Sequence, residues 1–472
     1  MSNVKKNKYL LKNTLLISLG SLGSKLITFF LVPLYTYVLS KEAYGTVDLI
    51  TTISIVIIPI ITLNIQESVM RFTMDKNSNF NQIVSVGLIT MFITLLFGIL
   101  SILILSSIDA LSEYSLLIGL YMVMYGFSQF LLCFIRGQEK LAEYSIINII
   151  QVFFIAGINV VSLLWLKLGV KGYLISYILS YFITSIICSI RINLLHYIFH
   201  FEVNKKLASE MIKYSVVLIP NSLMWWIMNS LDRIMVTTMI GLEENGLYAV
   251  SYKIPSIIIT LTTIFNQAWM FSAIKGKDDS DKEEYTNNIY TFFYSMLIIV
   301  SLFLILIMKP LMKIYVGNDF YNAWLYMPPL VIGTFFLTLG TFISNEYTTH
   351  KDSIGFLKSS SFGAFINLIL NFLFIPMIGV MGAAIATCVS YLGVFIFRLC
   401  DTRKYLKLHV LDGTKTLEII LLVISGLFVY FNNALSIIVP AICLILEVLI
   451  KRKIFFSFYY VIKKMGGKKS DL

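Results

Sequence analysis

The sequence contains few charged residues. Asp, Glu, Lys and Arg together make up 13% of its 472 residues, whereas about a quarter is usual in soluble domains. Apolar residues make up 58%, and the mean hydropathy is +0.83. This composition excludes a soluble enzyme, a disordered chain and a nucleic-acid-binding protein, and it indicates an integral membrane protein. We therefore expect the net charge of +11 to face the cytoplasm and anionic lipid.

Motifs for metal binding, disulfide formation and ATP hydrolysis are also missing from the sequence. The five cysteines lie in or beside apolar runs and form no CxxC pair, and the four histidines lie outside these runs. No GxxxxGK[ST] motif is present, so the chain is not expected to hydrolyse ATP. We expect no catalytic residue, no metal site and no cofactor.

Long apolar runs dominate the rest of the chain. A membrane-spanning helix needs roughly 20 apolar residues, and fourteen segments come close to this length. The last two are short and share a turn at Asn432–Asn433, so whether both span the membrane stays open. The predicted spans are Leu15–Leu39, Thr46–Gln66, Ile83–Ile108, Tyr114–Ile135, Ser145–Leu166, Tyr173–Ile190, Tyr214–Ile240, Leu247–Phe271, Ile289–Met308, Leu325–Ser344, Leu357–Pro376, Met381–Phe397, Leu417–Phe431 and Leu435–Ile450.

The basic residues predict the orientation of these spans. If the N-terminus is cytoplasmic, most of the 37 Lys and Arg residues fall in the inside segments, as the positive-inside rule requires. Both termini are therefore predicted to be cytoplasmic. The outside segments hold five basic residues, namely Lys41, Lys167, Lys171, Lys309 and Lys313.

Two segments recur six spans further along the chain. LSKEAYG at 39–45 matches IGLEENG at 240–246, and GVKGYLISYILSYFITSI at 169–186 matches GVMGAAIATCVSYLGVFI at 379–396. The repeat predicts two six-helix lobes, at 1–204 and 205–411, followed by a terminal helix pair and basic tail at 412–472. Because six is an even number of spans, we expect a pseudo-two-fold axis along the membrane normal, with a substrate site between the lobes. Chance similarity between apolar helices is the alternative, and two matches with one period argue against it.

Three basic residues, Lys25, Arg233 and Lys253, fall inside predicted spans. A charge at the centre of a spanning helix costs about 2.5–3.5 kcal/mol on insertion scales, so such residues usually face a cavity or a partner. Each of the three belongs to a polar stripe at helical spacing, which favours an aqueous cationic cavity for an anionic headgroup such as pyrophosphate. The candidate substrate-binding residues are Lys25, Arg233, Lys253, Ser21, Thr28, Asn229, Ser256, Thr260 and Gln267.

The alternative is that these cations neutralise buried carboxylates. Asp48 and Asp232 are the candidates, and an ion pair is a simpler role for them than coupling to an ion gradient. Adjacent residues on a helix point in different directions, so Asp232 and Arg233 are not expected to pair directly. Glu346 is expected to be an ordinary charge at the membrane edge.

Four prolines are expected inside helices one, two, seven and eight, at Pro33, Pro59, Pro220 and Pro255. Proline removes a backbone hydrogen bond and can kink a helix. Kinked helices would suit a transporter that opens alternately to each side of the membrane.

Two runs resemble a known family. NTLLISLGSLGSKLITFFLVPLYTYVLSKEAYGTVDL (Asn13–Leu49) and YSVVLIPNSLMWWIMNSLDRIMVTTMIGLEENGLYAVSYKIPSI (Tyr214–Ile257) are similar to signatures of bacterial polysaccharide transporters, the Wzx-type O-antigen and capsule flippases. The resemblance implies the multidrug/oligosaccharidyl-lipid/polysaccharide exporter superfamily, with a cationic central cavity and alternating access. It also implies coupling to a proton or sodium gradient or to the membrane potential. Related peptidoglycan-precursor flippases have more arginine in the first helix than this chain with its Lys25, which argues against lipid II as the substrate.

The leading hypothesis is a flippase that carries undecaprenyl-pyrophosphate-linked oligosaccharide across the bacterial plasma membrane, for O-antigen, lipopolysaccharide, capsule or exopolysaccharide assembly. The expected partners are this substrate, membrane lipids, and the glycan polymerase and glycosyltransferases of the same pathway; no nucleic acid is expected.

A cation-coupled multidrug or metabolite exporter is the first alternative, although three basic residues would repel a cationic drug. A membrane glycan polymerase or ligase ranks last, because the outside segments hold no histidine and no arginine. A scaffold role in envelope assembly stays open.

Overall fold

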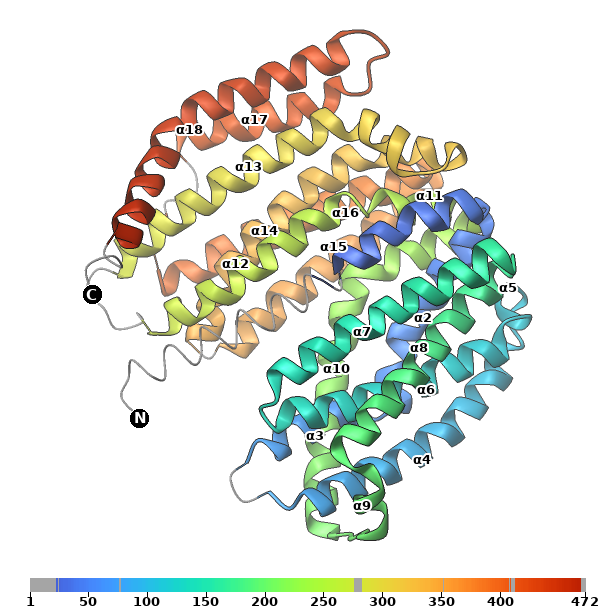
Figure 1. The fold of residues 1–472 in the computed structure, drawn as a ribbon. Helices are drawn as coiled ribbons and strands as arrows, with labels where there is room; N and C mark the ends of the chain where they lie inside the picture. Colours follow the sequence, from blue (N-terminus) through green and yellow to red (C-terminus); the bar gives the residue numbers. More distant parts are fainter. Residues whose placement is uncertain are drawn as a thin grey trace. The chain divides into compact units, whose positions relative to one another are not determined.

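The computed structural model describes residue 23 and residues 25–75, 78–275, 282–350, 352–406, 408 and 412–467, with the backbone alone at some positions (Figure 1). Every regular element in these ranges is a helix. The described chain forms two compact units, Met1–Ala249 with Val316–Phe320, and Val250–Tyr315 with Tyr321–Leu472.

The first unit is a bundle built around α6. It begins with a helix at Lys25–Val38. Phe130 and Phe134 of α6 are completely buried and pack among residues of α3, α4 and α8. The further elements are α2 (Lys41–Ile61), α3 (Ile65–Thr73), α4 (Phe80–Leu105), α5 (Asp109–Ser112), α6 (Ser115–Gly137), α7 (Leu141–Val160) with the π-helical turn η1 (Val161–Trp165), α8 (Gly169–Ile192), α9 (Leu194–Phe199), α10 (Lys205–Met239) and the start of α11 (Leu242–Ser251).

The second unit packs around α14. Phe335, Leu339 and Phe342 of this helix are buried, and α14 contacts α12, α13, α15, α16 and α17. The Phe342 ring stacks on the rings of Phe293 and Trp269 at centroid distances of 5.3 and 5.2 Å. The elements are α12 (Pro255–Lys275), α13 (Lys282–Tyr315), the part of η2 (Asn318–Tyr326) from Tyr321 on, α14 (Met327–Thr349), α15 (Ser353–Ile378), α16 (Val380–Asp401), η3 (Thr402–Lys404), α17 (Gly413–Phe428) and α18 (Leu435–Gly467).

The prediction of an all-α membrane protein is confirmed. Each of the fourteen predicted spans overlaps one or two helices of the structure, although the first residues of Leu15–Leu39 lie outside the described part. Nine helices in the described ranges are long and apolar enough to cross a membrane. The lobe boundaries and the axis between the lobes stay predictions.

Two predicted spans are broken in the structure. The second, placed at Thr46–Gln66, ends as α2 at Ile61, and α3 follows after Leu63 and Asn64, whose φ angles are 50° and 52°. The eighth, placed at Leu247–Phe271, is interrupted between α11 and α12. Pro255 is therefore the first residue of a helix and not an interior residue. Proline suits this position because its missing N–H would have no partner there.

The repeated glycines occupy equivalent positions in the helices. Gly169 and Gly379 have φ angles of +55° and +63°, a conformation that glycine adopts without strain, and they lie at the starts of α8 and α16. Within the first unit, a Cβ atom on Gly45 would overlap the Leu242 carbonyl oxygen, and one on Gly246 would overlap the Lys41 carbonyl oxygen. The repeated glycines 45 and 246 thus let the starts of α2 and α11 touch through their backbones.

We predict that Gly45→Ala lowers the stability of the protein by about 1–3 kcal/mol, because the added methyl group pushes against backbone that cannot rotate away. Gly157→Ala in α7 is the matched control, since nothing lies within 4 Å of the Cβ it adds. Thermal unfolding of the two purified variants in detergent measures their stabilities. Equal melting temperatures for the two variants would contradict the close contact.

Candidate functional site

A buried polar cluster lies where α2, α10 and α11 meet in the first unit. Asp48 of α2 is 5% exposed, and Arg233 Nη1 of α10 lies 2.8 Å from its Oδ1 atom. The other carboxylate oxygen accepts a hydrogen bond of 3.4 Å from Asn245 Nδ2 of α11. The same amide nitrogen donates to the Gly45 carbonyl at 3.2 Å. Asp48 therefore connects all three helices.

The Asp232 carboxylate accepts hydrogen bonds from a tyrosine hydroxyl and a backbone N–H. The Tyr248 hydroxyl of α11 donates to its Oδ2 at 2.7 Å, and the Arg233 backbone N–H donates to its Oδ1 at 2.9 Å. Asp232 and Tyr248 are 3% and 0% exposed. The contact between the two neighbours on α10 thus involves the Arg233 backbone, in accordance with the different directions of their side chains.

For Arg233, the structure therefore shows the ion pair that the sequence offered as the alternative to an open anion site. Breaking a buried pair by removing one partner leaves an uncompensated charge, which is strongly destabilising. Asp48 and Arg233 thus have a clear structural role in joining α2 to α10.

The other predicted site residues lie in different places. Lys25 and Thr28 are exposed on the helix Lys25–Val38, while Ser21 lies outside the described residues, as do the side chains of Asn229 and Gln267. The remaining three belong to the second unit, at and after the break between α11 and α12, and these are Lys253, Ser256 and Thr260.

The predicted stripe of α12 is largely satisfied by its own backbone. Lys253 is partly buried and lies in the turn before the helix, not on the helix. The Ser256 hydroxyl donates to the Lys253 carbonyl at 2.7 Å, and the Thr260 hydroxyl donates to the Ser256 carbonyl at 2.9 Å. Each hydroxyl keeps an acceptor lone pair that a ligand could use.

A small polar pocket of about 200 Å³ lies between α12 and α14, and sequence reasoning missed most of its residues. Asn345 is 8% exposed, and its Nδ2 has no hydrogen-bond partner among the described residues; the Oδ1 of Asn266 likewise has none. Uncharged hydroxyl and amide groups suit a neutral hydroxyl-rich ligand or water. The other lining residues are Ile259, Thr262, Thr263, Leu337, Thr338 and Thr341.

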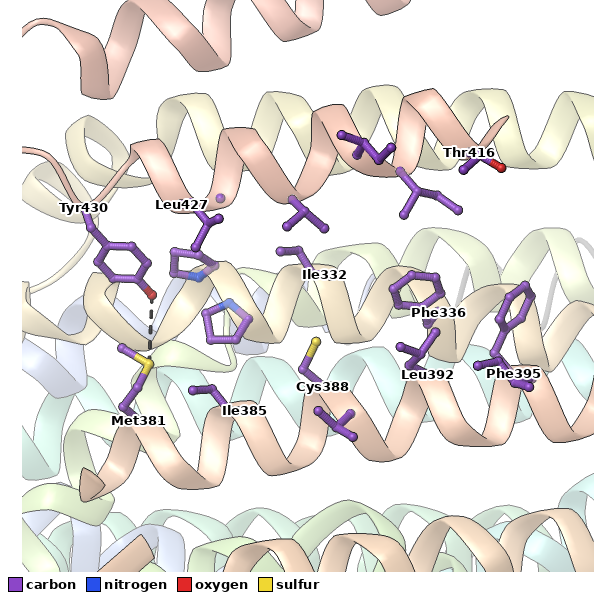
Figure 2. Close-up of a pocket in the computed structure, with 18 residues that line it drawn as sticks. Ile332, Phe336, Met381, Ile385, Cys388, Leu392, Phe395, Thr416, Leu427 and Tyr430 are labelled. Atoms are coloured by element: carbon purple, nitrogen blue, oxygen red, sulfur yellow. Dashed lines mark hydrogen bonds between the residues drawn. The ribbon is translucent and has the colours of Figure 1, made fainter. Parts of the chain in front are cut away.

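A larger pocket in the second unit is almost wholly apolar. Its volume is about 760 Å³, and α14, α16 and α17 line it. Figure 2 shows Ile332 and Phe336 of α14 between residues of α16, such as Leu392, and residues of α17, such as Leu427. Its polar end is marked by the Tyr430 hydroxyl, which donates to the Leu325 carbonyl at 2.7 Å. Such a lining suits a hydrocarbon chain.

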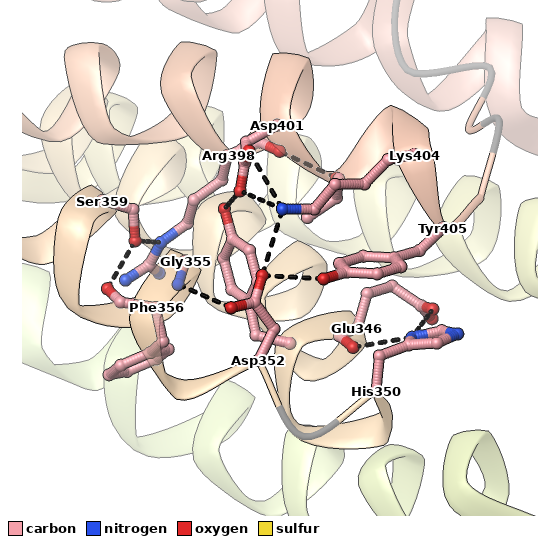
Figure 3. Close-up of polar contacts among 12 residues, drawn as sticks. Glu346, His350, Asp352, Gly355, Phe356, Ser359, Arg398, Asp401, Lys404 and Tyr405 are labelled. Atoms are coloured by element: carbon pink, nitrogen blue, oxygen red, sulfur yellow. Dashed lines mark hydrogen bonds and ion pairs between the residues drawn. The ribbon is translucent and has the colours of Figure 1, made fainter.

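Charged residues gather at one end of α14, α15 and α16 in the second unit (Figure 3). Asp352 accepts hydrogen bonds from the Gly355 N–H at 2.8 Å and from the Tyr405 hydroxyl at 2.7 Å, and its Oδ2 lies 3.0 Å from Lys404 Nζ. These contacts, the Gly355 N–H first among them, lower the pKa of Asp352 to about 2.

Glu346 in the same region corrects one expectation. The sequence placed it as an ordinary membrane-edge charge, but it is 3% exposed and its Oε2 lies 3.1 Å from Lys282 Nζ. His350 Nδ1 lies 3.6 Å from the same oxygen. Hydropathy could not reveal this pairing, because the partners are far apart in the sequence.

We predict that Asp48→Asn and Arg233→Gln each lower stability by about 1–3 kcal/mol and that the double variant loses less than their sum. Each single change leaves one charge of the pair without its partner. Because the Arg233 side chain keeps 20% exposure, the loss of stability should be smaller than for a completely buried ion pair. A thermal-unfolding double-mutant cycle measures the coupling. The exposed pair Lys41 and Glu243 is the control and should couple by less than about 1 kcal/mol. Additive losses at Asp48 and Arg233 would contradict the ion pair.

The Asp352 contacts predict a pH dependence. A carboxyl group whose pKa is lowered in the folded state adds stability above its unfolded value, here 3.8, and loses that contribution as the pH falls to about 2. Asp352→Asn should therefore melt at a lower temperature than the unchanged protein near neutral pH, and the difference should close between pH 3.8 and about 2. Asp75→Asn is the control, because Asp75 forms an exposed ion pair with Arg71. This variant should change the melting temperature less than Asp352→Asn does. A difference that stays constant across this window would contradict the assignment.

Comparisons with solved structures show the same fold in membrane transporters. The chain superposes on the lipid II flippase MurJ in its inward closed conformation with a TM-score of 0.68, at 14% identity, covering 94% of this chain and 100% of that one. A multidrug resistance MATE family transporter of the MOP superfamily, in its inward-facing conformation, superposes with a TM-score of 0.66 at 14% identity. The match covers 82% of this chain and 94% of that one. A MOP superfamily transporter from Pyrococcus furiosus superposes with a TM-score of 0.58 at 13% identity. This match covers 83% of this chain and 95% of that one.

A comparison with curated proteins finds no match. The sequence model of the polysaccharide biosynthesis protein family matches residues 10–275, which is more than half of the chain and contains both runs that resemble bacterial polysaccharide transporters. The chain therefore has the fold of the MurJ and MATE transporter structures. The chain belongs to the polysaccharide biosynthesis protein family.

Proposed function

We infer that this protein is a flippase for undecaprenyl-pyrophosphate-linked oligosaccharide units, which it moves from the inner to the outer leaflet by alternating access. The observation that carries this proposal is the match of a polysaccharide biosynthesis family to a chain with a MurJ-like and MATE-like transporter fold. The product would be assembled into O-antigen, capsule or exopolysaccharide. The protein acts in this proposal as a transporter, without a catalytic residue or a cofactor.

The three parts of such a substrate have matching surfaces in the described residues. Lys25, which is exposed on the helix Lys25–Val38, is the cation proposed for the pyrophosphate. The polar pocket with Asn266 and Asn345 offers donors and acceptors for sugar hydroxyl groups. The apolar pocket between α14, α16 and α17 offers space for part of the polyprenyl chain.

The surrounding assignments belong to the same proposal. The protein would lie in the bacterial plasma membrane with both termini in the cytoplasm, as the distribution of Lys and Arg favours. A proton or sodium gradient, or the membrane potential, would drive the cycle. The glycosyltransferases that build the unit and the polymerase that uses it would be its partners in the pathway.

The test is translocation of a fluorescent undecaprenyl-pyrophosphate oligosaccharide between the leaflets of liposomes that contain the purified protein. We expect protein-dependent flipping, and we expect Lys25→Ala to reduce its rate at least about tenfold, the loss of roughly one charge-assisted contact. Lys171→Ala is the matched control, because this exposed lysine pairs with Glu113 and should leave the rate unchanged.

The negative outcomes separate the alternatives. Full activity of Lys25→Ala would remove Lys25 from the site without removing the function. Absence of flipping with either ion gradient, together with efflux of a cationic dye, would replace the flippase proposal by the multidrug exporter.

A further inference from the structure

Two glutamates are buried together in the last helix pair of the second unit. Glu418 of α17 and Glu447 of α18 are both 0% exposed. The helices α17 and α18 pack against each other and against α13 (Figure 1). Each glutamate lies close enough to the other for their charges to interact. Neither belongs to the substrate pockets described above.

Lys451 is paired with Glu418 and lies one helical turn after Glu447. Lys451 Nζ lies 2.7 Å from Glu418 Oε1 and is itself 4% exposed. It follows Glu447 by one turn on α18, at the spacing where helical side chains are neighbours. Both carboxylate oxygens of Glu447 are buried, and neither has a hydrogen-bond partner among the described residues. An ionised carboxylate in such a place is unfavourable, because burial removes its water and nothing replaces it.

The other charged groups near the cluster are already balanced. Lys415 of α17 pairs with Asp412, with 3.4 Å between Nζ and Oδ2. From α13 come two neutral groups, Tyr294, whose hydroxyl donates to the Lys415 carbonyl at 3.1 Å, and Tyr290. α14 faces α17 through the apolar pocket. Glu418, Glu447 and Lys451 therefore have a net charge of −1 when all three are ionised.

We propose that Glu418 and Glu447 together bind one exchangeable proton, so that the α17–α18 pair contains a proton-binding site. The proton forms an O–H bond on one carboxyl group, which can donate to the other carboxylate, and the buried cluster becomes neutral. A metal cation fits less well, because the Lys451 ammonium group beside Glu418 repels it. The inference concerns the carboxyl groups themselves and does not depend on the proposed substrate.

Release of the proton would leave one uncompensated negative charge between the two helices. The cluster lies beside the basic residues Lys415, Lys451 and Arg452, at the end of the helix pair that the charge pattern places on the cytoplasmic side. A proton could therefore exchange with that side when α17 and α18 separate enough to admit water. Proton binding and the packing of the terminal pair are thereby linked.

The test is labelling of the purified full chain with dicyclohexylcarbodiimide, which reacts with protonated carboxyl groups in apolar surroundings, followed by mass spectrometry of the peptides that contain Glu418 and Glu447. We expect about one label per chain on this pair, decreasing as the pH is raised. Glu447→Gln should abolish labelling of Glu418 as well, since the remaining carboxylate and Lys451 then balance. Glu418→Gln should in turn abolish labelling of Glu447.

Lys451→Met should increase labelling of the pair about twofold at the same pH, because both carboxyl groups then need a proton. Glu113→Gln, at an exposed ion pair with Lys171, is the control and should leave the labelling unchanged. Size-exclusion chromatography identifies variants that fail to fold. Absence of label on the folded unchanged protein, or persistence of label on Glu418 in Glu447→Gln, would overturn the proposal. Protection by sodium chloride but not by choline chloride at constant pH would replace the proton by a metal cation.

Discussion

The backbone contact between α2 and α11 determines the arrangement of the polar residues in the first unit. Gly45 and Gly246 leave no side chain between the two helix starts, so the main chains touch. Because the helices are this close, Asp48 reaches Asn245 on α11 as well as Arg233 on α10. A larger residue at either glycine would separate the helices and leave a buried carboxylate with fewer partners. The hydrogen bond between Asn245 and Asp48 therefore depends on the two glycines.

The cost of desolvation explains how the other polar groups are arranged. Partly buried hydroxyls such as those of Ser256 and Thr260 donate to carbonyls of the preceding turn, which satisfies them without a partner helix. Buried charges need a partner from another element, and Lys282 supplies it for Glu346. Glu447 departs from this pattern, because no residue that the structure describes forms a hydrogen bond with its carboxylate oxygens. Such exceptions are where a protein is expected to exchange a proton or hold a ligand.

Hydropathy predicted the helices well and their interruptions poorly. The break at residues 62–64 lies in the apolar run that the sequence assigned to one span, and hydropathy averaged over such a run hides the buried polar residues Thr62 and Asn64. The break before Pro255 had a local signal, since proline begins helices more easily than it continues them. The burial of Glu346 had no local signal in the sequence, because its partner Lys282 lies in a different helix.

The sequence by itself determined that the chain is helical, crosses the membrane many times and belongs to the polysaccharide biosynthesis protein family, because apolar length and local motifs are properties of single segments. It also identified Gly45 and Gly246 as equivalent positions. Only the tertiary structure decided that these glycines touch opposing backbones, that Arg233 is paired with Asp48, and that the buried Glu447 carboxylate has no hydrogen bond within the described part of the chain. Partnership between charges depends on distances across helices, and the helical period of a sequence specifies only which residues share a face.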